Sequence, residues 1–101
     1  MPAKAVSTMA DTEKSLDTLI GQPVVLDTAG SIVYLGTLLE VRPEGFWLGD
    51  ADLRDGTEGH VTKERYICEC RERGVRPNRQ RIFVFAHAVI SMSPLNAVIT
   101  D

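Results

Sequence analysis

Short apolar runs separated by turn signals dominate the first half of the chain. Three of them, rich in Val, Ile, Leu and aromatic residues, cover residues 24–26, 32–41 and 46–48. The connections at 27–30 and 42–45 hold the glycine, proline and acidic residues typical of tight turns. This pattern predicts three consecutive antiparallel strands. Gly36 lies inside the middle run, where a missing side chain lets a strand bend, and a bent meander of this kind begins a small barrel.

The first twenty residues divide into a tail and a short helix. Residues 1–10 are small, polar and without periodicity, so we expect a disordered N-terminal tail. Residues 11–20 begin with residues that can cap a helix and carry acids in the first turn. Leu16, Leu19 and Ile20 then fall on one helical face. This stripe is too short to be stable alone, so the predicted helix must pack on the barrel.

The segment 62–73 also has a helical period. Tyr66, Ile67 and Cys70 share one helical face, and Gly74 follows as a stop signal. A strand over the same residues stays open, because an aromatic residue and two thiols also alternate there. We favour the helix, because the charged residues of the segment fit an exposed helical face.

Two apolar runs near the C-terminus predict the last two strands. Residues 81–86 are apolar on both faces, and residues 88–93 form a shorter run that Pro94 ends. The other connections that we expect are a glycine-rich acidic loop at 49–59, a turn at 77–80 and a tail at 95–101. The pattern therefore predicts a mainly β fold, a small closed barrel of five strands with a short N-terminal helix and a helical segment between the third and fourth strands.

Length and composition fit one small soluble domain. The chain has 101 residues, of which 44% are hydrophobic and 25% charged, enough for one modest core over residues 11–101. It has neither an apolar run long enough to cross a membrane nor a signal-peptide pattern, so we expect a cytoplasmic protein without a membrane partner. Cys68 and Cys70 are too close to bridge without strain and are expected to be free thiols.

Charge is distributed unevenly along the chain. The segment 61–81 holds seven basic and three acidic residues, a net charge of +4, whereas the whole chain has a net charge of −3 and the remainder therefore −7. An anionic partner would explain this asymmetry, and so would a solvated face that complements an acidic neighbouring subunit.

The order of these elements resembles the Sm-like family, which includes bacterial Hfq and the Sm and LSm proteins. That family has a short N-terminal helix followed by a strongly bent, five-stranded open barrel of the small SH3-like kind. The resemblance therefore implies such an open barrel, here with a helical insertion. The match covers residues 16–94 and is interrupted by an insertion at 52–80, between the third and fourth strands. The residues similar to the two family motifs are Gly36, Leu38, Val41, Leu48, Asp50 and Ala51 for the first motif and residues 84–89 (VFAHAV) for the second.

The resemblance implies a ring of identical copies, in which the fourth strand of one copy pairs with the fifth strand of the next. The two C-terminal runs support this inference, because apolar edge strands without an internal charge or proline aggregate unless they are paired. The expected interface residues are Ile82, Phe83, Val84, Phe85, Val89, Ile90 and Met92.

The family binds RNA, and this chain keeps some residues suited to it. The expected RNA-binding residues are Asn78, Arg79, Arg81, Phe85 and His87. Arginine forks bind phosphate, Phe85 can stack on a base, and His87 matches the Hfq version of the motif. The same side chains also fit a strand-entry turn paired with nearby acids, a core aromatic residue and a turn histidine.

Two departures from the family favour a second function. The turn at 42–46 lacks the Asp and Asn of the family's base-binding turn, and Ala86 stands where the family has a cation. A scaffold or protein-interaction ring that has lost RNA binding therefore stays open, with the helix at 62–73 facing a protein partner. An unrelated barrel of the SH3 or OB type stays open as well.

No catalytic constellation is visible, so we do not expect an enzyme. Cys68 and Cys70, with His60 or His87, are poor metal ligands, because residues two apart on a helix point to nearly opposite sides. We expect neither a metal nor another cofactor. Trp47 is expected in the core or at a subunit interface rather than against a base.

Overall fold

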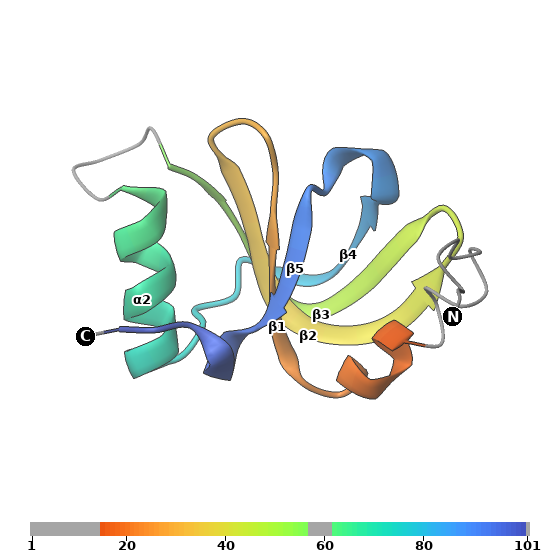
Figure 1. Ribbon diagram of the computed structural model, residues 1–101, viewed down its shortest axis with the longest axis horizontal. Coiled ribbons are helices and arrows are strands. Elements are labelled where there is room, and N and C mark those ends of the chain that lie inside the picture. Colours follow the sequence, from red (N-terminus) through yellow and green to blue (C-terminus); the bar gives the residue numbers. More distant parts are fainter. Residues whose placement is uncertain (1–14, 57–61, 101) are drawn as a thin grey trace, which may run out of the picture.

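Five antiparallel strands form one sheet in the order β4-β3-β2-β1-β5 (Figure 1). The computed structural model describes residues 15–56 and 62–100. The elements are η1 (Asp17–Leu19), β1 (Pro23–Asp27), β2 (Ile32–Arg42), β3 (Gly45–Asp55), α2 (Lys63–Arg73), β4 (Arg79–Phe85), η2 (Ala86–Ala88), β5 (Ser91–Pro94) and η3 (Leu95–Ala97). The sheet is not closed, because β4 and β5 are its two edges and do not pair with each other. The closed barrel predicted from the residues is therefore wrong, whereas the open form implied by the family resemblance is confirmed. The mainly β, five-stranded class is confirmed.

The sheet bends in the middle of β2, where Gly36 lies (Figure 1). A Cβ added at Gly36 would be 2.9 Å from the Cβ of Ala51, so the missing side chain lets β2 and β3 approach closely. The register between β2 and β3 shifts twice within residues 35–40. Such irregularities bend a strand and increase its twist.

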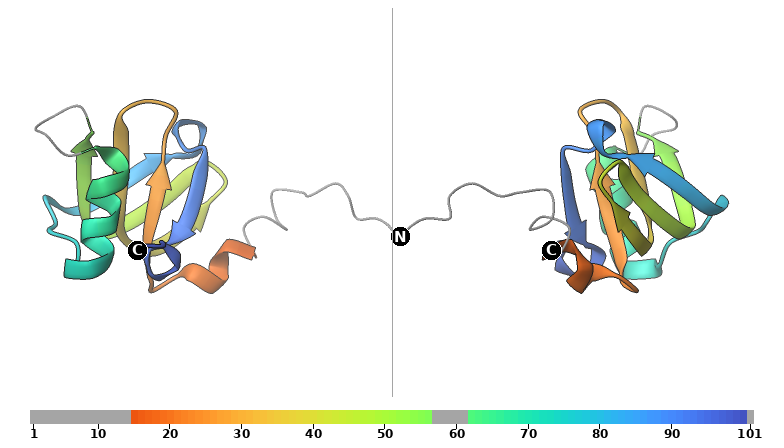
Figure 2. Two further views of the ribbon diagram at one scale, coloured as in Figure 1. Left: turned by 60° about the vertical axis from the view of Figure 1, so that its left-hand side comes forward. Right: turned by 90° about the vertical axis from the view of Figure 1, so that its right-hand side faces the viewer.

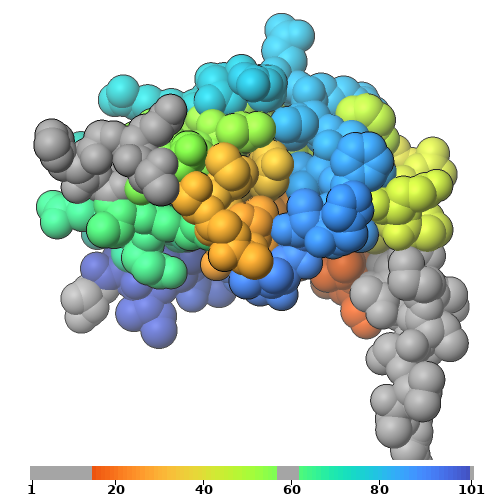
Figure 3. All heavy atoms as spheres, turned by 90° about the horizontal axis from the view of Figure 1, so that it is seen from above, coloured from red at the N-terminus to blue at the C-terminus, as the bar shows by residue number. Residues whose placement is uncertain are grey.

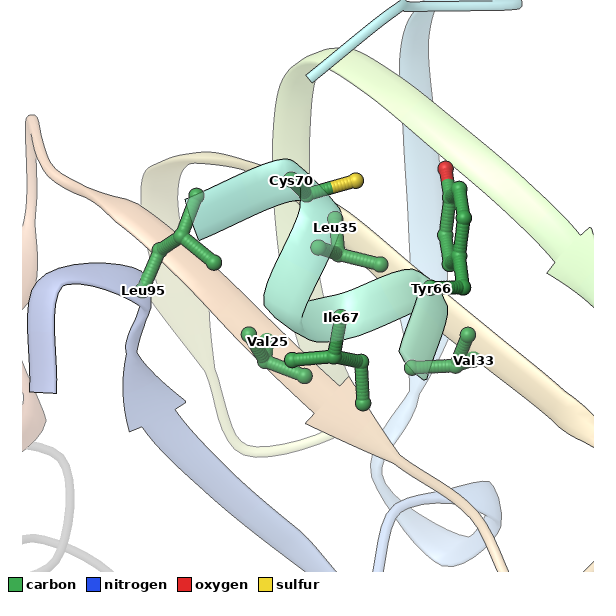
Figure 4. Packing of buried hydrophobic residues seen from close by; sticks show 7 residues of the cluster. All are labelled: Val25, Val33, Leu35, Tyr66, Ile67, Cys70 and Leu95. Carbon is green, nitrogen blue, oxygen red and sulfur yellow. The ribbon is translucent and has the colours of Figure 1, made fainter. Parts of the chain in front are cut away.

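Strand β1 is buried on both faces, which explains its unbroken apolar run. Val24 and Leu26 point into a cluster inside the bend, whereas Val25 points into a cluster beneath α2. The inner cluster comprises Val24, Leu26, Leu38, Leu48, Ala51 and Val84. The outer cluster, drawn in Figure 4, comprises Val25, Val33, Leu35, Tyr66, Ile67, Cys70 and Leu95.

Helix α2 begins and ends where the sequence predicts, so the alternative strand over these residues is excluded. The Thr62 side chain accepts a hydrogen bond from the backbone N–H of Arg65 at 3.1 Å and caps the first turn. Gly74 ends the helix with a φ of 93°, which favours glycine. The buried residues of α2 are the predicted Tyr66, Ile67 and Cys70.

Lys63 ties the start of α2 to the turn between β1 and β2. Its Nζ lies 2.6 Å from Asp27 Oδ1 and also donates to the carbonyl oxygens of Gly30 and Thr28, at 2.6 and 3.2 Å. Figure 2 shows α2 standing alongside the sheet, with η3 near its C-terminal end. The apolar face of α2 is therefore occupied within the chain, and a partner of α2 would meet its polar face.

Two predicted connections between strands are wrong in their bounds. Strand β3 runs to Asp55, so the first part of the loop predicted at 49–59 is extended. This stretch is extended because it pairs with the first half of β2, where Ile32 lies opposite Asp55. Strand β4 begins at Arg79, inside the turn predicted at 77–80.

The predicted fifth strand at 88–93 is too long at its start, and its end is misplaced. The chain must cross from one sheet edge to the other, and it does so through η2 before it pairs with β1 over Ser91–Pro94. Pro94 lies inside β5 rather than beyond it. The predicted tail at 95–101 begins with η3, whose Leu95 is buried in the outer cluster.

The described end of the predicted N-terminal helix is helical. Residues 15 and 16 are in a helix, η1 follows, and Leu19 packs against the inner cluster while Ile20 is exposed. The predicted tail at 1–10, the start of that helix and the part of the acidic loop that precedes His60 lie outside the described residues, as does His60 itself. Among the described residues, no helix is long and apolar enough to cross a membrane.

Candidate nucleic-acid interface

A row of aromatic and cationic side chains runs along β4 and the neighbouring start of β3. The Arg81 guanidinium carbon lies 4.5 Å from the centre of the Trp47 ring. The Trp47 ring meets Phe83 edge to face at 5.0 Å, and Phe83 meets Phe85 at 5.1 Å. Phe85 in turn stacks on His87, with ring centres 5.9 Å apart. We call Arg81, Trp47, Phe83, Phe85 and His87 the β4 row.

Strand alternation and register build the β4 row. Ile82 and Val84 pack on the inner cluster, so Phe83 and Phe85 point to the opposite face of the sheet. Trp47 lies directly opposite Phe83 across the β3–β4 ladder. Phe85 and Arg81 lie opposite Gly45 and Gly49, which have no side chains to cover them.

The aromatic part of the β4 row becomes more exposed from Trp47 toward His87. Trp47 and Phe83 are half-buried, whereas Phe85 is 56% exposed and both Arg81 and His87 are exposed. An aromatic side chain of this size so open to water is unusual on a sheet face and points to a binding surface. Leu39, which is also exposed, lies beside Gly49 on the same face.

The turn between β2 and β3 lies beside η2, where the β4 row ends. The backbone N–H of Ala86 donates to the carbonyl oxygen of Glu44 at 2.8 Å. Figure 3 shows the two segments next to each other, η2 in blue and the turn in yellow-green. Only Pro43 and Glu44 separate the two strands, so neither an Asp nor an Asn is present in this turn.

The structure brings together only part of the predicted RNA-binding set. Arg81, Phe85 and His87 belong to the β4 row. Asn78 is used structurally, because its side-chain amide accepts from Leu53 N–H and donates to Leu53 C=O, both at 3.1 Å. Arg79 is exposed beside it and donates to the Asn78 carbonyl oxygen at 3.0 Å. Asn78 and Arg79 therefore lie at the opposite end of β4 from His87.

The residues predicted for the subunit interface divide between the two faces of the sheet. Those packed on the chain's own inner cluster are Ile82, Val84, Val89 and Met92. Phe83 and Phe85 point outward in the β4 row, and Ile90 is 64% exposed. Val89 and Ile90 lie between η2 and β5, whereas the other five residues lie in β4 and β5. Both strands are sheet edges, so their outer backbone groups have no partner strand within residues 15–56 and 62–100.

Trp47 was predicted in the core or at a subunit interface, and the structure places it outside both buried clusters. Sequence reasoning missed its place in the β4 row. The contact depends on the register between β3 and β4, which puts Trp47 opposite Phe83. The alternation of both strands was visible in the sequence, but their register was not.

A second polar region lies between α2 and the end of β3, apart from the β4 row. This α2–β3 cleft is lined by Asp52, Arg54, Tyr66, Cys70, Arg73 and Arg76, among others. Burial raises the pKa of the Asp52 carboxyl above its usual value, although the charges of Arg54 and Arg79 lower it. Burial, and next the charge of Asp52, raises the pKa of the Cys70 thiol to about 11.

The two cysteines do not act together. Cys70 is buried in the outer cluster, whereas the Cys68 sulfur is 3.7 Å from the carbonyl oxygen of Ile99. Across residues 15–56 and 62–100, no group of three or more His, Cys, Asp or Glu side chains is placed to hold a metal ion.

Comparison with known proteins supports the fold and little else. Searches found no matching family model and no matching curated protein. A solved structure, the Pyrococcus abyssii Sm protein in complex with a uridine heptamer, matches with a TM-score of 0.55 and 13% sequence identity, over 80% of this chain and 93% of that chain. At 13% identity this likeness shows the fold alone, and the chain therefore has an Sm-like fold.

Proposed function

We propose that this protein forms a ring of identical copies and binds single-stranded RNA through the β4 row. The observation that carries this proposal is the row itself, a line of aromatic rings and cations on an uncovered sheet face. The proposal includes no enzymatic activity, and we place the protein in the cytoplasm.

Two open sheet edges support the ring. Strands β4 and β5 each have one side without a partner strand among the described residues. Pairing β4 of one copy with β5 of the next satisfies both edges by a single head-to-tail contact, and a closed ring of such contacts leaves no edge free. The Sm-like fold supports this arrangement, because a ring with the fourth strand of one copy paired to the fifth strand of the next is what the family resemblance implies.

RNA binding follows from the chemistry of the β4 row. Bases stack on exposed aromatic rings with about 1–3 kcal/mol per base, and every base has a face that can do so. Phe85 and His87 offer such rings at the exposed end, while Arg81 and Arg79 supply guanidinium forks for phosphate. The structural neighbour was solved with a uridine heptamer, so oligouridine is the natural first probe.

Fluorescence anisotropy with labelled oligo-U and oligo-A tests the RNA part. We expect binding in the range of about 1–100 μM that weakens steeply with salt. Replacing both Arg79 and Arg81 by Ala should weaken binding of all sequences alike, and Phe85→Ala should weaken it as well. Arg71→Ala is the matched control, because Arg71 is an exposed arginine of α2 far from the row. Binding that survives the double variant unchanged would refute this function.

Native mass spectrometry tests the ring separately. A closed assembly of one fixed size is expected for the full chain and for Phe85→Ala. A monomer at high protein concentration would contradict the ring, whereas an intact ring without RNA binding would contradict only the RNA part.

One observation favours a second function, an oligomeric scaffold that binds a protein. The turn between β2 and β3 contains only Pro43 and Glu44, and Ala86 beside it carries no charge. The turn next to the exposed end of the β4 row therefore lacks the Asp, the Asn and the neighbouring cation of the family's base-binding site, and its charged residue, Glu44, is an acid. Rings that assemble but leave oligo-U and oligo-A unbound would support the scaffold.

A further inference from the structure

The α2–β3 cleft has the size and burial of a small-molecule site. Its volume is about 470 Å³, within the range of about 300–1,000 Å³ typical of ligand pockets. Its floor is formed by Asp52, Tyr66 and Cys70, which are 5%, 8% and 4% exposed. Its rim is formed by the side chains of Arg54, Arg73 and Arg76, together with Glu69, whose carboxylate lies 3.8 Å from the Arg65 guanidinium.

Among the groups on the floor, the Tyr66 hydroxyl is the one that indicates a bound ligand. It is buried, and no hydrogen-bond partner for it exists within the described residues. Leaving a buried hydroxyl unpaired costs about 1–3 kcal/mol, so a native protein tolerates it rarely. Figure 4 shows the hydroxyl on the same side of α2 as the Cys70 sulfur, and both residues line the cleft.

The rim supplies uncommitted positive charge. Arg54 lies over the Tyr66 ring, with its guanidinium carbon 4.6 Å from the ring centre. Within residues 15–56 and 62–100, none of the three rim arginines forms an ion pair with a carboxylate. Gly74, with its positive φ, reverses the chain between Arg73 and Arg76 and so brings both to the same cleft. Guanidinium forks of this kind bind phosphate oxygens in pairs.

The buried carboxylate of Asp52 limits the kinds of ligand that the cleft can bind. A buried carboxylate on the floor disfavours a bare anion and favours a group that donates hydrogen bonds. A suitable ligand therefore carries phosphate at one end, for the rim, and an N–H-bearing polar edge at the other, for Asp52 and the Tyr66 hydroxyl. We infer that the α2–β3 cleft binds a nucleoside monophosphate, with its phosphate on Arg73 and Arg76 and its base edge at Asp52 and Tyr66.

The cleft shares no lining residue with the proposed RNA surface, although the charge of Arg79 also acts on Asp52. The cleft lies between α2 and the end of β3, whereas the β4 row ends at η2, at the far end of β4. Asn78 holds the end of β3 in place through its paired bonds with Leu53 and lines one side of the cleft. A mononucleotide could therefore bind whether or not the β4 row binds RNA.

Isothermal titration calorimetry on the full chain tests the inference with four probes: AMP, UMP, inorganic phosphate and adenosine. We expect saturable binding of at least one nucleotide at one site per chain, and clearly weaker binding of phosphate and adenosine. Replacing both Arg73 and Arg76 by Ala should weaken nucleotide binding by about tenfold or more, since charge-assisted hydrogen bonds are lost. Arg71→Ala, on the same helix but outside the cleft, should leave it unchanged.

Tyr66→Phe separates a ligand-binding role from a structural one. Without ligand, the variant should melt at the same temperature as the native chain or higher, because it loses only an unpaired hydroxyl. With ligand, it should bind the nucleotide severalfold more weakly. A lower melting temperature without ligand would show that the hydroxyl already has a partner, and would contradict the inference.

Three further outcomes would overturn it. They are no saturable nucleotide binding at millimolar concentration, inorganic phosphate or adenosine binding as tightly as the nucleotides, and equal losses in Arg71→Ala and in the double variant. Arg81→Ala must leave nucleotide binding intact, because Arg81 lies in the β4 row and not in the cleft. Failure of RNA binding would therefore leave this inference standing, and the reverse holds as well.

Discussion

The face of the sheet that points away from the inner cluster has two halves, one covered and one open. Under α2, Val25, Val33 and Leu35 are sealed by a helix from the same chain. Along β4, Phe83 and Phe85 have no such cover, and Phe85 is 56% exposed. Both halves carry apolar side chains. The half that α2 covers is part of the core, and the half without a covering helix is the candidate binding surface.

An arginine stacked on an aromatic ring occurs in both halves. Arg54 lies 4.6 Å from the Tyr66 ring centre in the covered half, and Arg81 lies 4.5 Å from the Trp47 ring centre in the open half. In the covered half this pair borders a cleft with a buried floor, whereas in the open half it belongs to the β4 row, which becomes exposed toward Phe85 and His87. The same local contact thus suits a small ligand in one place and a chain of bases in the other.

The largest difference should appear when each half loses one side chain. Ile67→Ala removes a residue that is 5% exposed in the outer cluster, and should lower the free energy of unfolding by about 2–5 kcal/mol. Phe85→Ala in the open half should change it by less than about 1 kcal/mol, because the side chain is already in water. Urea unfolding of both variants measures this, and equal losses would abolish the distinction between the halves.

The bend that separates the halves can be tested at Gly36. A Cβ there would press on the Cβ and backbone of Ala51, so Gly36→Ala should destabilise the fold by about 1–3 kcal/mol. Gly30→Ala is the matched control, because a Cβ at Gly30 meets nothing within 4 Å. Thermal melts of the two variants should differ clearly, and an unchanged Gly36→Ala would show that the close approach does not matter.

The covering helix depends on its cap to a smaller extent. Thr62→Ala removes the acceptor for the Arg65 N–H and should cost about 0.5–2 kcal/mol of stability. Amide hydrogen exchange should show faster opening of α2 than of β1 and β2. If Thr62→Ala accelerated exchange equally in α2 and throughout the sheet, α2 and the sheet would unfold as one unit.

The smallest effect is a pH dependence that arises in the covered half. Because burial raises the pKa of folded Asp52 above 3.8, folding becomes less favourable as the pH rises from about 3.8 through that raised pKa. Asp52→Asn removes this penalty, so without ligand it should be more stable than the native chain at pH 7. The advantage should fade as the pH falls toward 3.8. Chemical unfolding at several pH values checks the trend, and an advantage that grows toward low pH would have the wrong sign.

Local patterns were sufficient to predict most elements. Short stretches of sequence predict the start of α2 at Thr62, its end at Gly74 and the alternation in β4. The bend at Gly36 is predicted in the same way. The order of the elements was then enough to indicate the Sm-like fold. What failed was the length of β3, because its end is extended only by pairing with β2, and an acidic, glycine-rich stretch does not reveal that partner.

The candidate site was predicted only in part for the same reason. Arg81, Phe85 and His87 stand on one alternating strand and could be grouped from the sequence. Trp47 joins them through the register between β3 and β4, which neither strand specifies by itself. Asn78 was assigned to RNA from its neighbours, but its amide holds the end of β3. The cleft beneath α2 needs tertiary docking of the helix, which no local pattern specifies.

The fluorescence of Trp47 during titration with oligo-U tests the central claim most directly, namely that the open half binds RNA. Trp47 is the only tryptophan in the chain and lies inside the β4 row. Bases that stack along the row should quench or shift its emission saturably, and Arg81→Ala should weaken this response while Arg71→Ala does not. Emission that stays constant while labelled oligo-U binds would place the RNA elsewhere and contradict the account.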